Sequence, residues 1–386
     1  KLTALYADPA DDFGNPVDVT DVAFYGVTLM SGTLYGPNSW ELANSPYLVT
    51  GDVVVDASAS LTIEPGVEVR FVPLSDDLST GQDANRSELY VYGTLVAEGT
   101  ETDNIIFTSN SETPSSGDWY GIYLQGGNAS ISLTYSEVAY ATYGVRGESL
   151  SNAETFRVNY SSIHNIGTGI YASSVYQYHE IIGNTIEFCS GGGIYSHYSN
   201  FQNSGVIEDN KILGANGDGI NLSYHNYFAL TRNKVEGGSE GSGLSFNQMH
   251  KVTMYQDSVL NRSGTGIYFG DNTTLAGVNE CVMTGNSGYG IQMSQANVTV
   301  EHSIISGNSS GIYIDTNFEN PTVDTVRYNT ITNNSNYGIR NSNYGRPVVQ
   351  FNDLYDNGSY DFRNNSSVWS ELDARYNWWG QATTDS

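Results

Sequence analysis

The chain has few cysteines, few prolines and few basic residues. Its 386 residues include 2 cysteines and 9 prolines, and 15 lysines and arginines stand against 42 aspartates and glutamates, a formal net charge of -27. Because Cys189 and Cys281 lie several repeats apart, we expect no disulfide between them. The negative field repels nucleic acid and anionic lipid, so neither is expected as a direct partner.

Long apolar runs and helix-forming residues are also scarce. No run approaches the ~20 apolar residues that span a bilayer, so no membrane insertion is expected. Alanine, leucine and lysine are sparse, whereas 42 glycines and 29 tyrosines favour strands and turns. A first residue other than methionine, Lys1, fits a mature chain that has lost a signal segment, although a boundary chosen within a longer chain would look the same. We therefore expect a secreted or cell-surface protein.

Two short motifs recur in step along the chain. The first is glycine followed by an apolar residue, as in GTGIYAS and GDGINLS, with successive copies 21 to 27 residues apart. Its apolar residues are Ile122, Val145, Ile170, Ile194, Ile220, Leu244, Ile267, Ile291, Ile312 and Ile339. The second motif has a polar residue first and an apolar residue third, as in NTI and NKV. It begins at Asn184, Asn210, Asn233, Asp257, Glu280, His302, Asn329 and Asn352.

These motifs predict a solenoid of stacked coils. The apolar residues alternate with period 2 between glycine, asparagine and serine, which is typical of short strands followed by turns. One such repeat cannot bury its apolar side chains alone, so coils must stack at ~4.8 Å with parallel strands and an apolar interior. The asparagines of the second motif would form a ladder in which each side-chain amide bonds to the coils above and below.

The motifs resemble the right-handed parallel β-helix repeat family of secreted and surface proteins. Residues 32–71, LYVYGTLVAEGT (89–100), IIFTSN (105–110) and GDWYGIYL (117–124) are similar to the opening coils of such proteins, and YNWWG (376–380) to a closing coil. The resemblance implies an all-β, right-handed parallel β-helix of about fourteen coils at residues 32–386. Residues 1–31 are then an N-terminal cap or linker, and residues 73–87 and 108–118 are expected to leave the coils as loops.

Three residues are candidates for catalysis. Asp218, between two glycines, has the position of a general acid, but other copies carry threonine, glycine, serine or tyrosine there, so a turn residue is expected. Lys211 and Lys234 fall in the same column, near Glu208 and Asp209. The resemblance includes lyases that use a basic residue beside calcium ligands. The alternative for the two lysines is a solvated strip, and calcium remains an open cofactor without a located site.

Five tyrosines are candidates for binding. Each follows the core residue of the first motif and should point outward on one face: Tyr123, Tyr171, Tyr195, Tyr268 and Tyr313. Such a stripe can stabilise the sheet through cross-strand pairs, mediate self-association or contact with a surface partner, or stack on sugars.

The family resemblance covers lyases, hydrolases, epimerases, adhesins and scaffolds, so the fold alone leaves the function open. We expect a structural or adhesive extracellular module without catalytic activity, which associates with itself or with a cell-surface or matrix partner. The alternative is a carbohydrate-active enzyme, a calcium-assisted polysaccharide lyase or a glycoside hydrolase, or a glycan-binding module.

Overall fold

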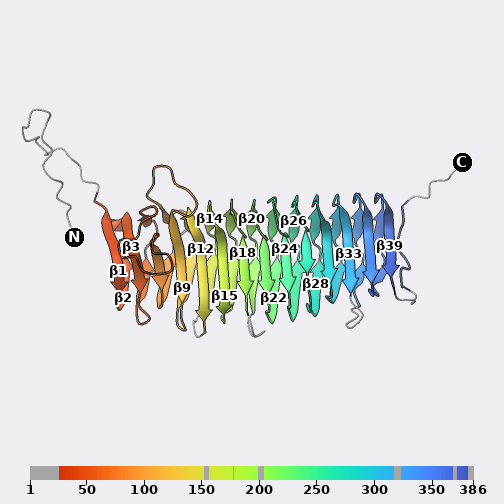
Figure 1. Ribbon diagram of the computed structural model, residues 1–386, viewed down its shortest axis with the longest axis horizontal. Helices are drawn as coiled ribbons and strands as arrows, with labels where there is room; N and C mark the ends of the chain where they lie inside the picture. Colours follow the sequence, from red (N-terminus) through yellow and green to blue (C-terminus); the bar gives the residue numbers. More distant parts are fainter. Residues whose placement is uncertain are drawn as a thin grey trace, which may run out of the picture.

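The computed structural model describes residues 26–151, 156–176, 178–198, 204–316, 323–367 and 372–380. These residues form an elongated parallel β-solenoid with β1 near one end and β39 near the other (Figure 1). Their strands build one 26-stranded and one 13-stranded sheet, and the described residues contain one short 3-10 helix, η1 (Leu42–Asn44). The predicted all-β solenoid is confirmed, with thirteen strands in the smaller sheet where about fourteen coils were expected.

Each regular coil contributes three strands. The first strand of each coil forms the 13-stranded sheet, the side sheet: β2 (Pro37–Trp40), β4 (Ser60–Ile63), β7 (Thr94–Glu98), β10 (Ser130–Thr134), β13 (Phe156–Asn159), β16 (His179–Ile182), β19 (Ser204–Glu208), β22 (Tyr227–Thr231), β25 (Lys251–Tyr255), β28 (Leu275–Asn279), β31 (Val298–Glu301), β34 (Thr325–Arg327) and β37 (Val348–Gln350). The second strand is mostly short: β5 (Glu68–Phe71), β8 (Ile105–Ser109), β11 (Ser136–Ala139), β14 (Ser162–His164), β17 (Thr185–Glu187), β20 (Lys211–Leu213), β23 (Lys234–Glu236), β26 (Ser258–Leu260), β29 (Val282–Thr284), β32 (Ile304–Ser306), β35 (Thr330–Thr332) and β38 (Asp353–Tyr355).

The third strand of each coil forms the surface that we call the long face. Its strands are β6 (Glu88–Val91), β9 (Trp119–Gln125), β12 (Ala141–Leu150), β15 (Thr168–Val175), β18 (Ile194–His197), β21 (Ile220–Ser223), β24 (Leu244–Asn247), β27 (Ile267–Phe269), β30 (Tyr289–Ser294), β33 (Ser310–Thr316), β36 (Tyr337–Asn343) and β39 (Tyr360–Ser366). At the N-terminal end, β1 (Thr28–Leu34) pairs with β3 (Tyr47–Val55), and β3 pairs with both β5 and β6.

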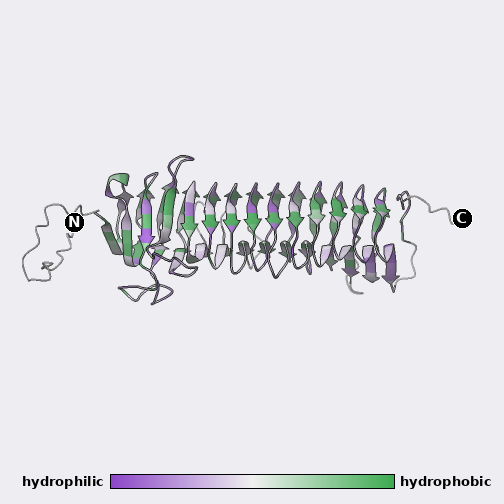
Figure 2. Cartoon of the chain, turned by 90° about the horizontal axis from the view of Figure 1, so that it is seen from above, coloured by the Kyte–Doolittle hydropathy of each residue, from purple (hydrophilic) through white to green (hydrophobic). Residues whose placement is uncertain are grey.

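The interior is apolar along the whole rod. Every apolar residue of the first motif is at most 1% exposed, because it alternates inward from the long face into the space between the sheets. Hydrophobic segments line up from coil to coil in Figure 2, as a period-2 pattern on stacked strands requires. Both cysteines are buried and free, in agreement with the sequence.

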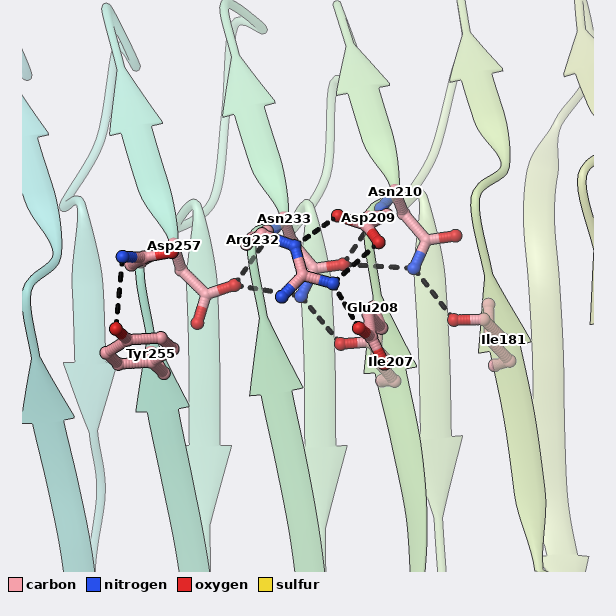
Figure 3. A network of polar contacts seen from close by, with 10 residues as sticks. Ile181, Ile207, Glu208, Asp209, Asn210, Arg232, Asn233, Tyr255 and Asp257 are labelled. Atoms are coloured by element: carbon pink, nitrogen blue, oxygen red, sulfur yellow. Dashed lines mark hydrogen bonds and ion pairs between the residues drawn. The ribbon is translucent and has the colours of Figure 1, made fainter.

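The predicted asparagine ladder is present. Asn184 donates to Asn210 at 2.9 Å, and all four ladder residues are at most 1% exposed. Asn210 donates to Asn233 at 2.9 Å and Asn233 to Asp257 at 2.8 Å (Figure 3). The ladder satisfies backbone groups as well, since the Asn233 side chain also donates to the Ile207 carbonyl at 2.7 Å.

The second motif was placed one residue too early at two of its copies. Cys281 and Ser303, and not Glu280 and His302, take the ladder positions, and the Cys281 amide donates to the Ser303 hydroxyl at 3.1 Å. Glu280 and His302 occupy the left-handed corner before the ladder, with φ of 54° and 51°. A shift of one residue also reverses which side chains point into the core. Ile304, expected inside, is 46% exposed, whereas Ile305 is buried.

Two loops interrupt the coils near the N-terminal end (Figure 1). The loop expected at residues 73–87 is present, whereas the loop expected at 108–118 begins only after Ser109, because Thr108 and Ser109 still pair with β5 as part of β8. Arg86 joins them, because its Nε donates to the Gly117 carbonyl at 2.6 Å while its Nη1 pairs with Asp83 at 2.5 Å. The first strand begins at Thr28, four residues before the predicted boundary. The remainder of the predicted cap, residues 1–25, lies outside the described residues.

Candidate functional site

One register-matched row of outward side chains runs along the long face. We call it the axial column, and its members in order are Tyr90, Tyr123, Arg146, Tyr171, Tyr195, Asn221, Ser245, Tyr268, Gln292, Tyr313, Arg340 and Arg363. Each residue follows the inward-pointing residue of its strand by one position, so it points to the opposite side of the sheet. The column contains all five predicted tyrosines, and it also contains three arginines that the sequence reasoning did not single out.

The first arginine of the column lies among tyrosine rings, in a cluster that we call the N-terminal site. The Arg146 guanidinium carbon is 4.7 Å from the ring centroid of Tyr143, 5.2 Å from that of Tyr123 and 5.5 Å from that of Tyr171. Glu148, on the same strand, accepts from Arg146 Nε at 3.1 Å and Nη2 at 2.5 Å. The positive charge is therefore compensated by a carboxylate of the same chain.

Burial makes the tyrosines of this site different from the predicted exposed stripe. Tyr123 is 0% exposed, because it packs against Tyr90 at 4.9 Å between ring centroids and its hydroxyl donates to Glu148 at 2.8 Å. Burial raises the pKa of Tyr120 to about 12 and the pKa of Tyr123 above its usual range. Tyr123 thus points outward but is covered, and its ring face is not available to a ligand.

The next two tyrosines of the column remain partly exposed. The rings of Tyr171 and Tyr195 stack with centroids 4.9 Å apart and an interplanar angle of 8°. His197 lies beside them, with its ring centroid 6.4 Å from that of Tyr195. Because stacked rings cover each other's faces, these residues present mainly ring edges and hydroxyls to the outside.

A second arginine and tyrosine cluster lies at the other end of the column, and we call it the C-terminal site. Arg340 lies 5.4 Å from the ring centroid of Tyr313 and 5.6 Å from that of Tyr337. Arg363 lies 5.5 Å from the ring centroid of Tyr360, and its Nη1 donates to the Tyr337 hydroxyl at 2.9 Å. No ion pair involves Arg340 or Arg363 within the described residues, unlike Arg146.

A buried acidic cluster lies beside the N-terminal site. Asp52 accepts from the Glu88 amide at 3.0 Å, Asp76 accepts from the Asp52 amide at 3.1 Å, and Thr80 donates to Asp52 at 2.6 Å. Burial raises the pKa of Glu88 to about 8, and the neighbouring Asp52 adds to the rise. Across the described part of the chain, no group of three or more histidine, cysteine, aspartate or glutamate side chains is placed to hold a metal ion.

Asp218 lies in a structural turn. Its carboxylate accepts from the Ser242 amide at 2.6 Å and from the Asn221 side chain at 2.7 Å. Asp218 also interacts electrostatically with Arg262, a buried residue that the sequence reasoning did not single out. The Arg262 guanidinium fills the space beside Gly238. No described contact joins Asp218 to Lys211 or Lys234. The proposed acid is thus engaged by Asn221 of its own coil and by the Ser242 amide of the next coil.

Lys211 and Lys234 are adjacent in register on β20 and β23, as expected from the motif. Lys234 pairs with Glu236 at 2.5 Å, and Lys211 is exposed. The carboxylates that were expected beside them are bound by another cation, since Arg232 contacts Glu208 and pairs with Asp209 at 2.7 Å (Figure 3). Whether any of these residues acts in catalysis stays a prediction.

The surface cluster around Arg232 supports a first experimental test. Replacing Arg232→Gln is expected to change the thermal midpoint by less than about 2 °C, because exposed ion pairs contribute little. The pKa of Asp209 is lowered by hydrogen bonding to Arg232, so the substitution should raise it toward its usual range. Calorimetry and NMR titration measure the two effects, and a large loss of stability would contradict the surface assignment.

A shallow hollow lies away from the column. It has a volume of about 230 Å³ and lies on the side sheet, among Lys251, Thr253, Leu275, Ala276, Gly277, Asn297 and Thr299. Lys251 is its one titratable lining residue, and the Lys251 ammonium lies 5.2 Å from the Tyr227 ring centroid. The hollow brings no acid and base together.

No helix among the described residues is long and apolar enough to cross a membrane.

The chain belongs to the family described as right handed beta helix region, whose model matches residues 97–277 and 168–325. The family resemblance drawn from the motifs is therefore confirmed. A 100-residue segment, 26% of this chain, is 32% identical to Protein bark beetle of Drosophila melanogaster. That match spans 3% of the length of the Drosophila protein.

Two solved structures are similar to this chain at low sequence identity. A mutant of the periplasmic alginate epimerase AlgG matches 92% of this chain and 85% of its own chain, with a TM-score of 0.57 and 13% identity. The A-module of the Azotobacter vinelandii mannuronan C-5 epimerase AlgE4 matches 83% of this chain and 91% of its own chain, with a TM-score of 0.43 and 13% identity. These likenesses concern the fold alone.

Proposed function

We propose that the protein is an extracellular, non-catalytic surface module that holds a polysaccharide along the axial column. The observation that carries the proposal is the column itself, with one tyrosine, arginine or amide side chain per coil over most of the rod. The coil rise of ~4.8 Å is close to the length of one pyranose unit, so a linear glycan parallel to the axis meets a new side chain at each sugar.

The composition of the column suits a sugar surface. Tyrosine hydroxyls and ring edges, with Asn221, Ser245 and Gln292 between them, offer donors and acceptors to hydroxyl groups over an amphipathic surface. Secretion or display at the cell surface places such a face beside matrix or wall glycans. Self-association of two copies through the same column is the competing use of this surface.

The contacts of the candidate groups support a role without catalysis. A general acid or base must reach the substrate with a suitable pKa. Asp218 instead accepts a hydrogen bond from the Ser242 backbone amide, and Glu148 instead forms an ion pair with Arg146. These contacts support a binding role over a chemical one.

A polysaccharide-modifying enzyme is the second candidate. It is favoured by the N-terminal site, where Arg146, Tyr120 and Glu148 lie close together and burial raises the pKa of Tyr120 to about 12. The fold shared with an alginate epimerase is compatible with it. In this alternative Arg146 would neutralise a substrate carboxylate, which requires displacement of Glu148 from the guanidinium.

Binding through the column is tested by native electrophoresis in gels that contain neutral or acidic polysaccharide. Replacing Tyr195→Ala is expected to weaken retardation about tenfold, because an aromatic side chain at the centre of a contact surface carries much of the affinity. Tyr255→Ala, an exposed tyrosine of the side sheet, is the matched control. Equal retardation of the two variants would contradict binding along the column.

A further inference from the structure

The two arginine clusters at the ends of the axial column differ in one respect. Both set a guanidinium between tyrosine rings, Arg146 in the N-terminal site and Arg340 in the C-terminal site. Among the described residues, Arg146 has a carboxylate partner and Arg340 has none. The partner of Arg146 is Glu148, which follows it by two positions and points to the same side of the strand. The N-terminal site therefore contains its own anion.

The equivalent positions in the C-terminal site are uncharged. Ser342 follows Arg340 by two positions and Asn365 follows Arg363 in the same way, and Ser342 and Asn365 are register partners. The nearest carboxylate of that row is Asp315, which accepts from the Asn343 side chain and makes no ion pair with Arg340. Two neighbouring cations thus lie side by side in a chain of net charge -27, and neither has a carboxylate in ion-pair contact within the described part of the chain.

Unpartnered polar atoms mark the same place. Ser342 is 6% exposed, and its hydroxyl has no hydrogen-bond partner among the residues that the structure describes. The same holds for the buried Nε of Arg340. Both groups can donate and both lie on the outward side of β36, so this part of the long face has more donors than acceptors among the described residues.

We propose that the C-terminal site binds the carboxylate or sulfate group of an acidic glycan, in the place that Glu148 holds on Arg146. The inference rests on the proposed function and adds the chemical class of the ligand and the end of the column at which its acid group binds. Arg340 and Arg363 bind the oxyanion, and the rings of Tyr313 and Tyr337 limit water around the contact.

A glycan fits this location better than an acidic peptide. Peptides are commonly held by main-chain hydrogen bonds at the edge of a sheet. The column lies on the surface of strands such as β33 and β36, which pair on both sides, so their backbone groups are already used. A chain of sugars can instead continue from Arg340 along Tyr313, Gln292 and Tyr268.

Calorimetric titration of the full chain with a short polyuronate oligomer, a sulfated oligosaccharide and a neutral oligosaccharide tests the proposal. Arg340→Gln is expected to weaken binding of the acidic ligands about tenfold or more and to leave neutral binding unchanged. Arg346→Gln, an exposed arginine outside the column, is the charge-matched control. The two acidic ligands together distinguish carboxylate from sulfate.

Two further variants add a carboxylate to the C-terminal site or remove one from the N-terminal site. Ser342→Glu should place an internal carboxylate beside Arg340 and abolish binding of the acidic ligand, as Glu148 does at the N-terminal site. Glu148→Gln should free Arg146 and raise the binding stoichiometry from one acidic group toward two. Circular dichroism establishes that the variants fold.

The outcomes separate this inference from the proposed function. If neutral and acidic glycans bind equally and Arg340→Gln has no effect, the C-terminal site does not bind an acid group, and the proposal of glycan binding remains. Tighter binding of polyaspartate than of polyuronate would overturn the glycan as ligand. If no polysaccharide binds the wild-type chain, the proposed function itself fails, and the inference fails with it.

Discussion

Replacing Arg262→Ala is expected to lower the free energy of unfolding by about 3–5 kcal/mol, one of the largest effects of any single substitution in this chain. The guanidinium is 1% exposed and donates to the carbonyls of Ala215 at 2.8 Å, Gly217 at 2.6 Å and Glu240 at 2.6 Å. Alanine would leave these acceptors buried without a donor. Urea-induced unfolding followed by fluorescence measures the loss.

The position of Arg262 explains why residue 238 is a glycine. A Cβ added to Gly238 would lie 2.1 Å from Arg262 Nη1, so the guanidinium occupies the place of that side chain. A second ladder begins at Arg262, since its backbone amide donates to Asn286 at 3.0 Å and Asn286 donates to Asn308 at 2.9 Å.

Arg262→Lys should recover only part of the stability that Arg262→Ala loses, because an ammonium cannot reach several carbonyls in fixed directions. If Arg262→Ala is no more harmful than Arg346→Ala at the surface, this assignment is wrong.

Replacing Asp257→Asn is expected to stabilise the protein at pH 8 and to have little effect at pH 4. Asp257 is 1% exposed in the first ladder, where it accepts twice from Asn233 while its Oδ2 has no partner. Burial raises the pKa of Asp257 to about 7. An uncharged carboxyl group can imitate asparagine, with one oxygen accepting and one hydroxyl donating.

The direction of the pH effect follows from proton linkage. The folded chain holds the Asp257 proton more tightly than the unfolded chain, so its favourable contribution is complete below about pH 4 and is lost as the pH rises through about 7. At pH 8 the gain from asparagine approaches about 4 kcal/mol, since each pKa unit corresponds to ~1.4 kcal/mol. Unfolding of both variants at several pH values measures the difference, with the exposed Asp353→Asn as control. A gain that does not vary between pH 4 and 8 would show that Asp257 is not buried as a neutral acid.

Much of the fold could be predicted because the interior imposes a strict pattern. Only an apolar residue fits after the glycine of the first motif, so residues such as Ile220 identify each coil. The ladder was harder to place, because Cys281 and Ser303 replace asparagine there and a polar corner residue precedes each of them. Ladder and corner positions both accept polar side chains, so sequence alone did not distinguish them at these two coils.

The candidate site was predicted only in outline. Alternation gave the outward direction of the tyrosines, and the same alignment of YGVRG and YGIRNS would have put Arg146 and Arg340 in their row. The burial of Tyr123 could not be predicted in this way, because the rings that cover it come from neighbouring coils and from the other outward rows. The two-residue spacing puts Glu148 on the same side of the strand as Arg146, but their contact also depends on side-chain conformations, which the sequence does not give.

The central claim is that the long face binds a polysaccharide without changing it. The most direct measurement mixes the full chain with an acidic polysaccharide for a day, and follows binding by sedimentation and the polymer by proton NMR and light scattering. The account predicts a bound polymer of unchanged length and sugar composition. Unsaturated chain ends, shortened chains or a changed ratio of sugar epimers would show an enzyme, and a polymer that never sediments with the protein would contradict the binding itself.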